Sequence, residues 1–217
     1  GVRRGDSRGE LLAGVAIGVA TVVKVFPGAL LVWFVLTRRW RAAAGVVAGA
    51  VAFVLVTMPF TGIEPWREFP AVLANLSAPS DTTDTLAPTV WLARYLGFSA
   101  ARILVSVAGL LIVASAALQA GRIEPARAFA IAMTASVLIA PALYHHYLAL
   151  LVLPFVLALG AGVQLRWLAL AYFLMWGGHQ NAIGDAAWIV NRALPTAGAF
   201  TLLLGLLVGS RGRGPQP

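Results

Sequence analysis

Long apolar stretches, separated by short polar segments that contain arginine, dominate this chain. A membrane-spanning helix needs about 20 mostly apolar residues, with a range of about 17–25. Six stretches have roughly this length and character: residues 41–59, 99–119, 126–143, 147–163, 166–177 and 193–209. The stretch 166–177 is short and needs support from neighbouring helices. The pattern predicts an all-α protein, a polytopic transmembrane helical bundle.

The first apolar stretch, residues 11–37, has two possible arrangements. It is long enough for one tilted span, but Lys24 and Pro27 interrupt it near the middle. Proline kinks a helix because it removes a backbone donor, and a cation inside the bilayer is costly unless it faces protein or water. We favour a broken or re-entrant hairpin that rises over 11–23 and returns over 27–37, since irregular membrane backbone is tolerated where it lines a cavity.

The arginines indicate the orientation of the chain. They gather on alternate loops, which the positive-inside rule assigns to the cytoplasm: Arg38, Arg39 and Arg41, then Arg122 and Arg127, then Arg166, then Arg211 and Arg213. The opposite loops carry mainly acidic groups: Glu64, Glu68, Asp81, Asp84 and Asp185, with Arg67, Arg94, Arg192 and Arg102. The basic N-terminal flank also favours the hairpin, because a single span would leave its three arginines outside. We expect a multi-pass plasma-membrane protein.

The longest polar region, residues 60–98, then lies on the extracytoplasmic side. It contains several prolines and two tryptophans, and its part from Trp66 to Leu76 is compatible with a short helix lying in the membrane interface. We expect residues 1–209 to form one membrane-embedded helical domain and residues 210–217 a disordered basic tail.

Composition excludes several other classes of protein. Of the 217 residues, 60% are apolar and 11% charged, and there is no cysteine; a soluble domain has about 25% charged residues. A soluble globule, a disordered chain, a disulfide scaffold and a cysteine-based metal or redox site are therefore excluded. The net charge of +8 does not indicate nucleic acid, because the basic residues lie singly or in short clusters between apolar runs.

Lys24 is the only lysine among sixteen basic residues and precedes the helix breaker Pro27. It could extend its ammonium to the interface, or it could face a protein-lined cavity and bind an anionic group such as a lipid phosphate. Its place in the middle of an apolar stretch favours the second interpretation.

The run Tyr144-His145-His146-Tyr147 lies at the predicted outer end of a span. Adjacent helical residues point to different faces, and no carboxylate or further histidine is close in sequence, so a metal site is not expected. The run is either an interfacial group of amphipathic rings or a polar site where histidine bonds a phosphate or moves a proton. Two other polar groups are expected to be turns: His179-Gln180-Asn181 with Asp185, and Asp81 with Asp84.

Taken together, these motifs resemble glycosyltransferase family 87, polyprenyl-phosphate-mannose-dependent mannosyltransferases of the GT-C superfamily. That family has Lys-x-x-Pro in an apolar segment and an Arg-Arg-Trp-Arg-like loop, similar here to Lys24–Pro27 and to Arg38–Arg41. A later Ser-Pro followed by an aromatic and a histidine pair is similar to Ala140 through His146, with Ala140 in place of serine and His145 where many members have aspartate. Residues Leu86 to Arg94 are similar to a family stretch that ends in Ala-Arg.

The resemblance implies a GT-C-like fold and transfer of a sugar, mannose in this family, from a polyprenyl-phosphate donor to a cell-envelope glycolipid or glycan at the extracytoplasmic face. It implies that His146 is catalytic and that Lys24, His145, Tyr144 and Arg94 bind substrate, with no metal or other cofactor. Family members have a catalytic acidic residue in the first extracytoplasmic loop, which is expected upstream of the printed sequence. The printed chain then corresponds to the C-terminal part of the family.

Two alternatives stay open. In a transporter or flippase of a lipid-linked or anionic substrate, Lys24 and half-helices would form a mid-membrane site. In a non-catalytic scaffold, a lysine within the membrane would have no clear purpose. The long outer loop and the polar residues gathered at one face favour the enzyme.

Overall fold

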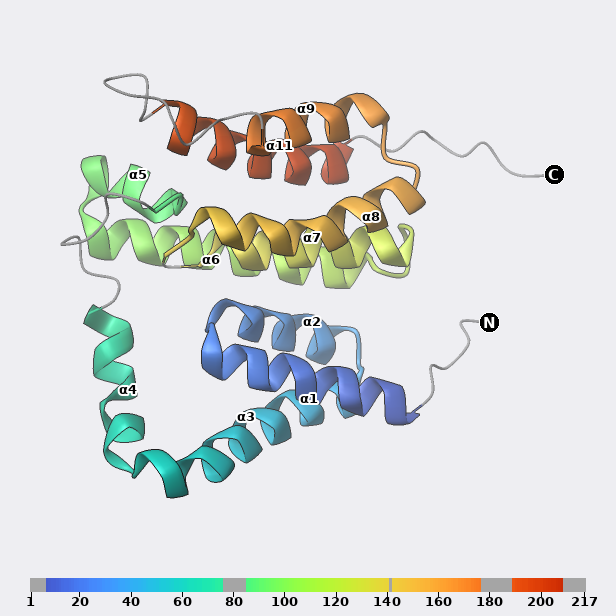
Figure 1. Ribbon diagram of the computed structural model, residues 1–217. Coiled ribbons are helices and arrows are strands. Elements are labelled where there is room, and N and C mark those ends of the chain that lie inside the picture. The colour runs from blue at the N-terminus through green and yellow to red at the C-terminus, as the bar shows by residue number, and fades with distance from the viewer. Residues whose placement is uncertain (1–6, 76–84, 141, 177–188, 209–217) are drawn as a thin grey trace. The chain divides into compact units, whose positions relative to one another are not determined.

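A computed structural model describes residues 7–75, 85–140, 142–176 and 189–208 of the chain (Figure 1). Throughout these ranges the backbone forms helices and connecting turns, without a strand. Three helical segments are long and apolar enough to cross a membrane: Trp40–Thr61, Phe98–Gln119 and Asn191–Val208. Four shorter apolar helices accompany them: Phe26–Leu36, Pro125–Leu138, His145–Gly160 and Leu165–Trp176. The all-α membrane bundle is confirmed.

The chain divides into two compact units, Gly1–Ala78 and Pro79–Pro217, and each is described by itself. Unit 1 contains α1 (Ser7–Val23), the 3₁₀ helix η1 (Phe26–Ala29), α2 (Leu30–Leu36), α3 (Trp40–Thr61) and α4 (Glu64–Asn75). Unit 2 contains α5 (Pro88–Leu96), α6 (Phe98–Gln119), α7 (Pro125–Leu138), the 3₁₀ helix η3 (His145–Leu151), α8 (Val152–Gly160), α9 (Leu165–Trp176), the π-helical turn η4 (Ile189–Ala193) and α11 (Leu194–Val208). The single domain over 1–209 stays a prediction.

Glycines bring α1 and α3 into backbone contact in unit 1. A Cβ atom added to Gly14 would lie 2.1 Å from the carbonyl oxygen of Ala42, and one added to Gly18 would lie 2.1 Å from that of Val46. Gly45 and Gly49 of α3 approach the α1 backbone in the same way. Each helix thus presents a pair of glycines four residues apart, the spacing that allows membrane helices to approach closely.

The register of these contacts establishes the path of the chain. Gly14 lies beside Ala42, and four residues further along each helix Gly18 lies beside Val46. The contacts advance in the same direction along both chains, so α1 and α3 run parallel. A chain that forms two parallel helices side by side must return between them, and η1 and α2 form this return segment (Figure 1). The broken first hairpin is therefore confirmed, with its rising arm in α1 and its returning arm in α2.

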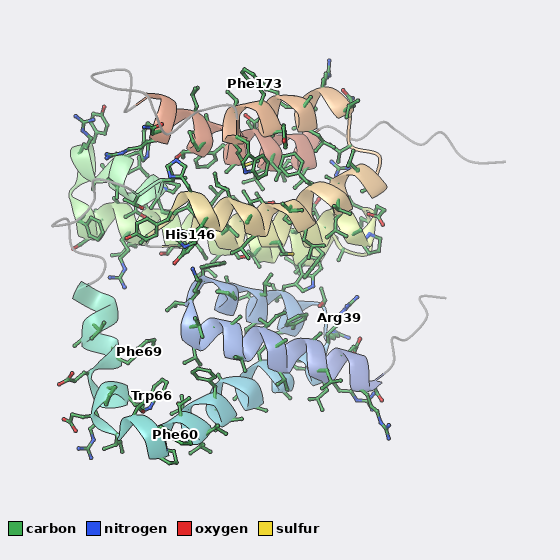
Figure 2. All side chains as sticks on the ribbon, viewed as in Figure 1. Arg39, Phe60, Trp66, Phe69, His146 and Phe173 are labelled. Atoms are coloured by element: carbon green, nitrogen blue, oxygen red, sulfur yellow. The ribbon has the colours of Figure 1, made fainter. Side chains whose placement is uncertain are left out.

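Unit 1 ends in α4, which covers most of the short interfacial helix expected from Trp66 onward. The Trp66 ring meets Phe53 of α3 edge-on with 6.4 Å between centroids, and its Nε1 donates to Thr61 Oγ1 at 3.3 Å. Phe69 packs on the same indole at 6.2 Å (Figure 2). These contacts fix the turn between α3 and α4, while the position of α4 at a membrane surface stays a prediction.

Unit 2 is built around α6, α7, α9 and α11. A Cβ at Gly198 of α11 would lie 2.5 Å from the Met175 side chain of α9, so these two helices are also in close contact. At the other end of α11, Arg127 of α7 donates from Nε to the Leu206 carbonyl at 2.6 Å and from Nη2 to the Leu207 carbonyl at 2.9 Å. A cation thus satisfies the last carbonyls of α11, which have no partner within their own helix.

The expected spans 41–59 and 99–119 correspond to α3 and α6 within two residues at each end. The span expected over 126–143 is shorter, because α7 ends at Leu138 and a separate turn follows. Residues 60–98, expected as a long polar loop, contain the helices α4 and α5.

Candidate functional site

Lys24 lies at the break between the two arms of the hairpin. Its backbone N–H still donates to the Ala20 carbonyl at 2.7 Å, so it closes the last turn of α1. The chain then bends, and Pro27 falls in the first turn of η1, where a missing N–H costs little. Lys24 is half-buried between the exposed Val23 and Val25. The residue therefore has the position expected for it, at the tip of a helical hairpin.

The hairpin tip lies short of the far end of α3. Each α1 residue in the glycine contacts with α3 meets residues that lie 28 to 34 positions later in the sequence. This offset places Lys24 about level with residues 52–58 of α3. Since α3 continues to Thr61, the tip does not pass the end of the longer helix. The hairpin is therefore shorter than the apolar helix of 22 residues that it packs against.

In unit 2, a buried set of hydrogen bonds holds the chain immediately before the two histidines. Thr85 Oγ1 accepts from the Leu143 N–H at 3.0 Å and donates to the Leu143 carbonyl at 3.2 Å. The Leu86 N–H also donates to the Leu143 carbonyl, and Thr196 of α11 donates to the Leu86 carbonyl at 2.9 Å. We call Thr85, Leu86, Leu143 and Thr196 the clasp. All four residues are buried, so the clasp fixes the chain two residues before His145.

The histidine pair begins η3 rather than ending a helix. Tyr144 has extended backbone angles, and His145 is the first residue of the 3₁₀ helix. Successive residues of a 3₁₀ helix are turned by about 120°, since it has three residues per turn. His145 is half-buried and His146 is exposed, so the two rings face different surroundings, as expected from their adjacency.

Two tyrosine rings contact the ring of the exposed His146, which Figure 2 labels. The Tyr144 ring is nearly parallel to that of His146, with 5.8 Å between centroids and 5° between planes. The Tyr147 ring meets the imidazole edge-on at 4.5 Å and 83°, and it also meets the Tyr144 ring edge-on at 5.9 Å. Together these three residues form a ring cluster of one imidazole and two phenols, all able to donate and accept hydrogen bonds. Such a set can bind sugar hydroxyls or phosphate oxygens at an exposed surface.

Arg94 is linked to the same clasp through the backbone. The clasp residues Thr85 and Leu86 lead directly into α5, where Arg94 lies six residues after Pro88, about 9 Å along the helix axis. Its side chain is exposed, and it makes no hydrogen bond or ion pair with any residue that the structure describes. The structure thus ties Arg94 and the ring cluster to one clasp in unit 2, whereas Lys24 belongs to unit 1.

The clasp and α5 were not expected from the sequence. One signal was available, because Pro88 is followed by Thr-Val-Trp-Leu, and proline favours the first turn of a helix. The role of Thr85 could not be found this way, since its partner Leu143 is 58 residues away. The expected turns at Asp81 and Asp84 and at His179 to Asp185, the basic tail and Pro141 lie outside the described residues. Within the described ranges, no three His, Asp or Glu side chains gather as a metal site would require.

Comparison with known proteins gives one match. The model of glycosyltransferase family 87 matches residues 2–154, which is more than half of the chain. The matched range includes the hairpin with Lys24, the loop Arg38–Arg41, α5 and the ring cluster, and it ends within α8. Neither a curated protein nor a solved structure matches the chain.

Proposed function

Because the chain belongs to glycosyltransferase family 87 and is a membrane glycosyltransferase, we propose that its donor is a polyprenyl-phosphate sugar, with mannose as the sugar. The acceptor is a glycolipid or glycan of the cell envelope, and transfer takes place on the extracytoplasmic side of the plasma membrane. The family match favours an enzyme over the transporter and the scaffold considered above.

The observation in unit 2 that supports this proposal is the exposed position of His146, whose ring contacts the rings of Tyr144 and Tyr147. Its imidazole can donate and accept hydrogen bonds, it follows the clasp residue Leu143 by three positions, and it lies inside the range that the family model matches. Tyr144 binds substrate hydroxyls next to it, and His145 has a smaller role because it is half-buried. Arg94, exposed at the end of α5, supplies a cation for the donor phosphate.

The reaction places a negative charge on the leaving phosphate. The acceptor oxygen bonds to the anomeric carbon of the sugar, the bond from that carbon to the phosphate oxygen breaks, and the bonding electrons stay on the phosphate. In unit 2, His146 and Arg94 stabilise this charge as a hydrogen-bond donor and a cation. The proton of the acceptor hydroxyl passes to a carboxylate base. This scheme requires no metal.

The test uses full-length protein in lipid nanodiscs, polyprenyl-phosphate [³H]mannose and an envelope lipid extract as the acceptor. Transfer of label by the wild-type protein is expected to be lost in Lys24→Ala, because the donor phosphate loses a cation inside the membrane. Lys24→Arg should retain a measurable part of the activity, and Val25→Ala, a change at the exposed neighbour, should retain nearly all of it.

Two results would count against the proposal. Turnover of Lys24→Ala equal to that of the wild type would remove the phosphate role of Lys24. In a parallel assay with a labelled nucleotide sugar, transfer of label from that donor and none from the polyprenyl-phosphate donor would overturn the proposed donor class.

A further inference from the structure

A cluster of arginines lies at the end of unit 1 opposite the hairpin tip. Because α1 and α3 run parallel in close contact, their first turns lie at the same end, where α2 also finishes. Arg8 of α1 and Arg38, Arg39 and Arg41 of the α2–α3 corner are all exposed there. Figure 2 shows Arg39 at this end. We call these four residues with Trp40 the basic corner.

Among the described residues of unit 1, one acidic group lies at the end that carries the basic corner. This acidic group is Glu10, which is half-buried near the start of α1. Arg38, Arg39 and Arg41 form no ion pair with any described residue. Trp40 adds an apolar ring that is 61% exposed at the first position of a 22-residue apolar helix. Arginine beside an exposed tryptophan at the start of a span is the composition expected at the boundary between lipid headgroups and acyl chains.

The backbone of the corner shows that arginine is placed there against local preference. The Arg39 N–H donates to the Phe34 carbonyl at 2.8 Å and the Arg38 N–H to that of Val35 at 3.0 Å, which is a Schellman ending of α2. Arg38 has φ +56° and occupies the position that such endings usually fill with glycine. A glycine would fit this turn more easily, so the guanidinium at this position indicates a role outside the fold.

We propose that the basic corner binds the headgroups of anionic phospholipids in the adjacent leaflet. Guanidinium groups form paired hydrogen bonds with phosphate oxygens, and Trp40 inserts beside the acyl chains. A zwitterionic headgroup carries no net charge, so the corner should distinguish phosphatidylglycerol from phosphatidylcholine. The site lies at the opposite end of α1 from Lys24, about 24 Å along the helix axis, and does not depend on the proposed transfer reaction.

The test is native mass spectrometry of the full-length protein in nonionic detergent, titrated with phosphatidylglycerol or phosphatidylcholine of the same acyl chains. The wild-type protein should prefer phosphatidylglycerol. Arg39→Gln with Arg41→Gln should reduce this preference about 25-fold, since each basic side chain near an anionic surface contributes about fivefold. Arg122→Gln with Arg166→Gln removes two other exposed charges and should retain the preference. Equal loss in both double variants, or no loss in either, would overturn the proposal.

Arg38→Gly separates lipid binding from folding. Glycine relieves the left-handed backbone, so the thermal stability in detergent should be unchanged or higher, while the preference for phosphatidylglycerol falls about fivefold. An unchanged lipid preference in this stable variant would contradict the role of Arg38. Displacement of phosphatidylglycerol by millimolar inorganic phosphate would identify a soluble-anion site instead and overturn the lipid assignment. Sugar transfer, measured on the same samples, should persist in each variant.

Discussion

His145 and His146 are adjacent in sequence but differ in exposure and in their ring contacts. His146 is exposed and its ring contacts the rings of Tyr144 and Tyr147, whereas His145 is half-buried. The cause is the 3₁₀ geometry of η3, which turns successive side chains by about 120°. A donor that stabilises a developing phosphate charge must reach substrate, and of the two rings His146 is the one placed to do so.

We therefore expect His146→Ala to reduce transfer roughly 10²–10³-fold, the usual cost of removing one stabilising donor. His145→Ala is the matched control and should reduce transfer much less. The measurement is the initial rate of label transfer at saturating donor, with thermal stability recorded for both proteins. Equal loss in the two variants, or a larger loss in His145→Ala, would show that the exposed ring is not the functional one.

At the scale of elements, the hairpin depends on the glycine contact between α1 and α3. An added Cβ at Gly14 would lie 2.1 Å from the Ala42 carbonyl oxygen, which is backbone and cannot rotate away. The two helices must then separate, and overpacking of this kind costs about 1–3 kcal/mol. This exceeds the gain in helix propensity of about 1 kcal/mol from glycine to alanine.

Gly14→Ala should consequently lower the melting temperature of the detergent-solubilised protein. Gly121→Ala, where an added Cβ meets no atom within 4 Å, should leave it nearly unchanged. Fluorescence-detected size-exclusion chromatography after heating measures both. A Gly14→Ala protein as stable as the wild type would mean that the α1–α3 contact does not support the fold.

The elements themselves were largely predictable, because apolar length and helix breakers act locally. Lys24 and Pro27 mark the break of the hairpin, and the spans 41–59 and 99–119 were found to within two residues at each end. The clasp was not predictable, because Thr85 and Leu143 pair through a buried hydroxyl over 58 residues. The close α1–α3 approach had a visible signal, two pairs of glycines spaced by four, whose partnership only the three-dimensional register shows.

At the scale of the whole molecule, the parallel packing of α1 and α3 bears on the side of the membrane at which α1 begins. If α3 crosses the bilayer, its start at Trp40 and its far end beyond Thr61 are on opposite sides. The start of α1 shares the side of Trp40, because the two helices begin at the same end of unit 1. By the positive-inside rule, we expect the arginines of the basic corner to lie on the cytoplasmic side.

Single cysteines test this topology, in a full-length background without other cysteines. Ser7→Cys and Arg39→Cys, both exposed positions, should resist an impermeant maleimide in intact cells and react after permeabilisation. Ile63→Cys, exposed just after α3, is the control and should react without permeabilisation. Labelling of Ser7→Cys alone at the cell surface would require α1 and α2 to form one continuous span. That arrangement is incompatible with the parallel α1–α3 contact, since the two helices would then begin on opposite sides of the membrane.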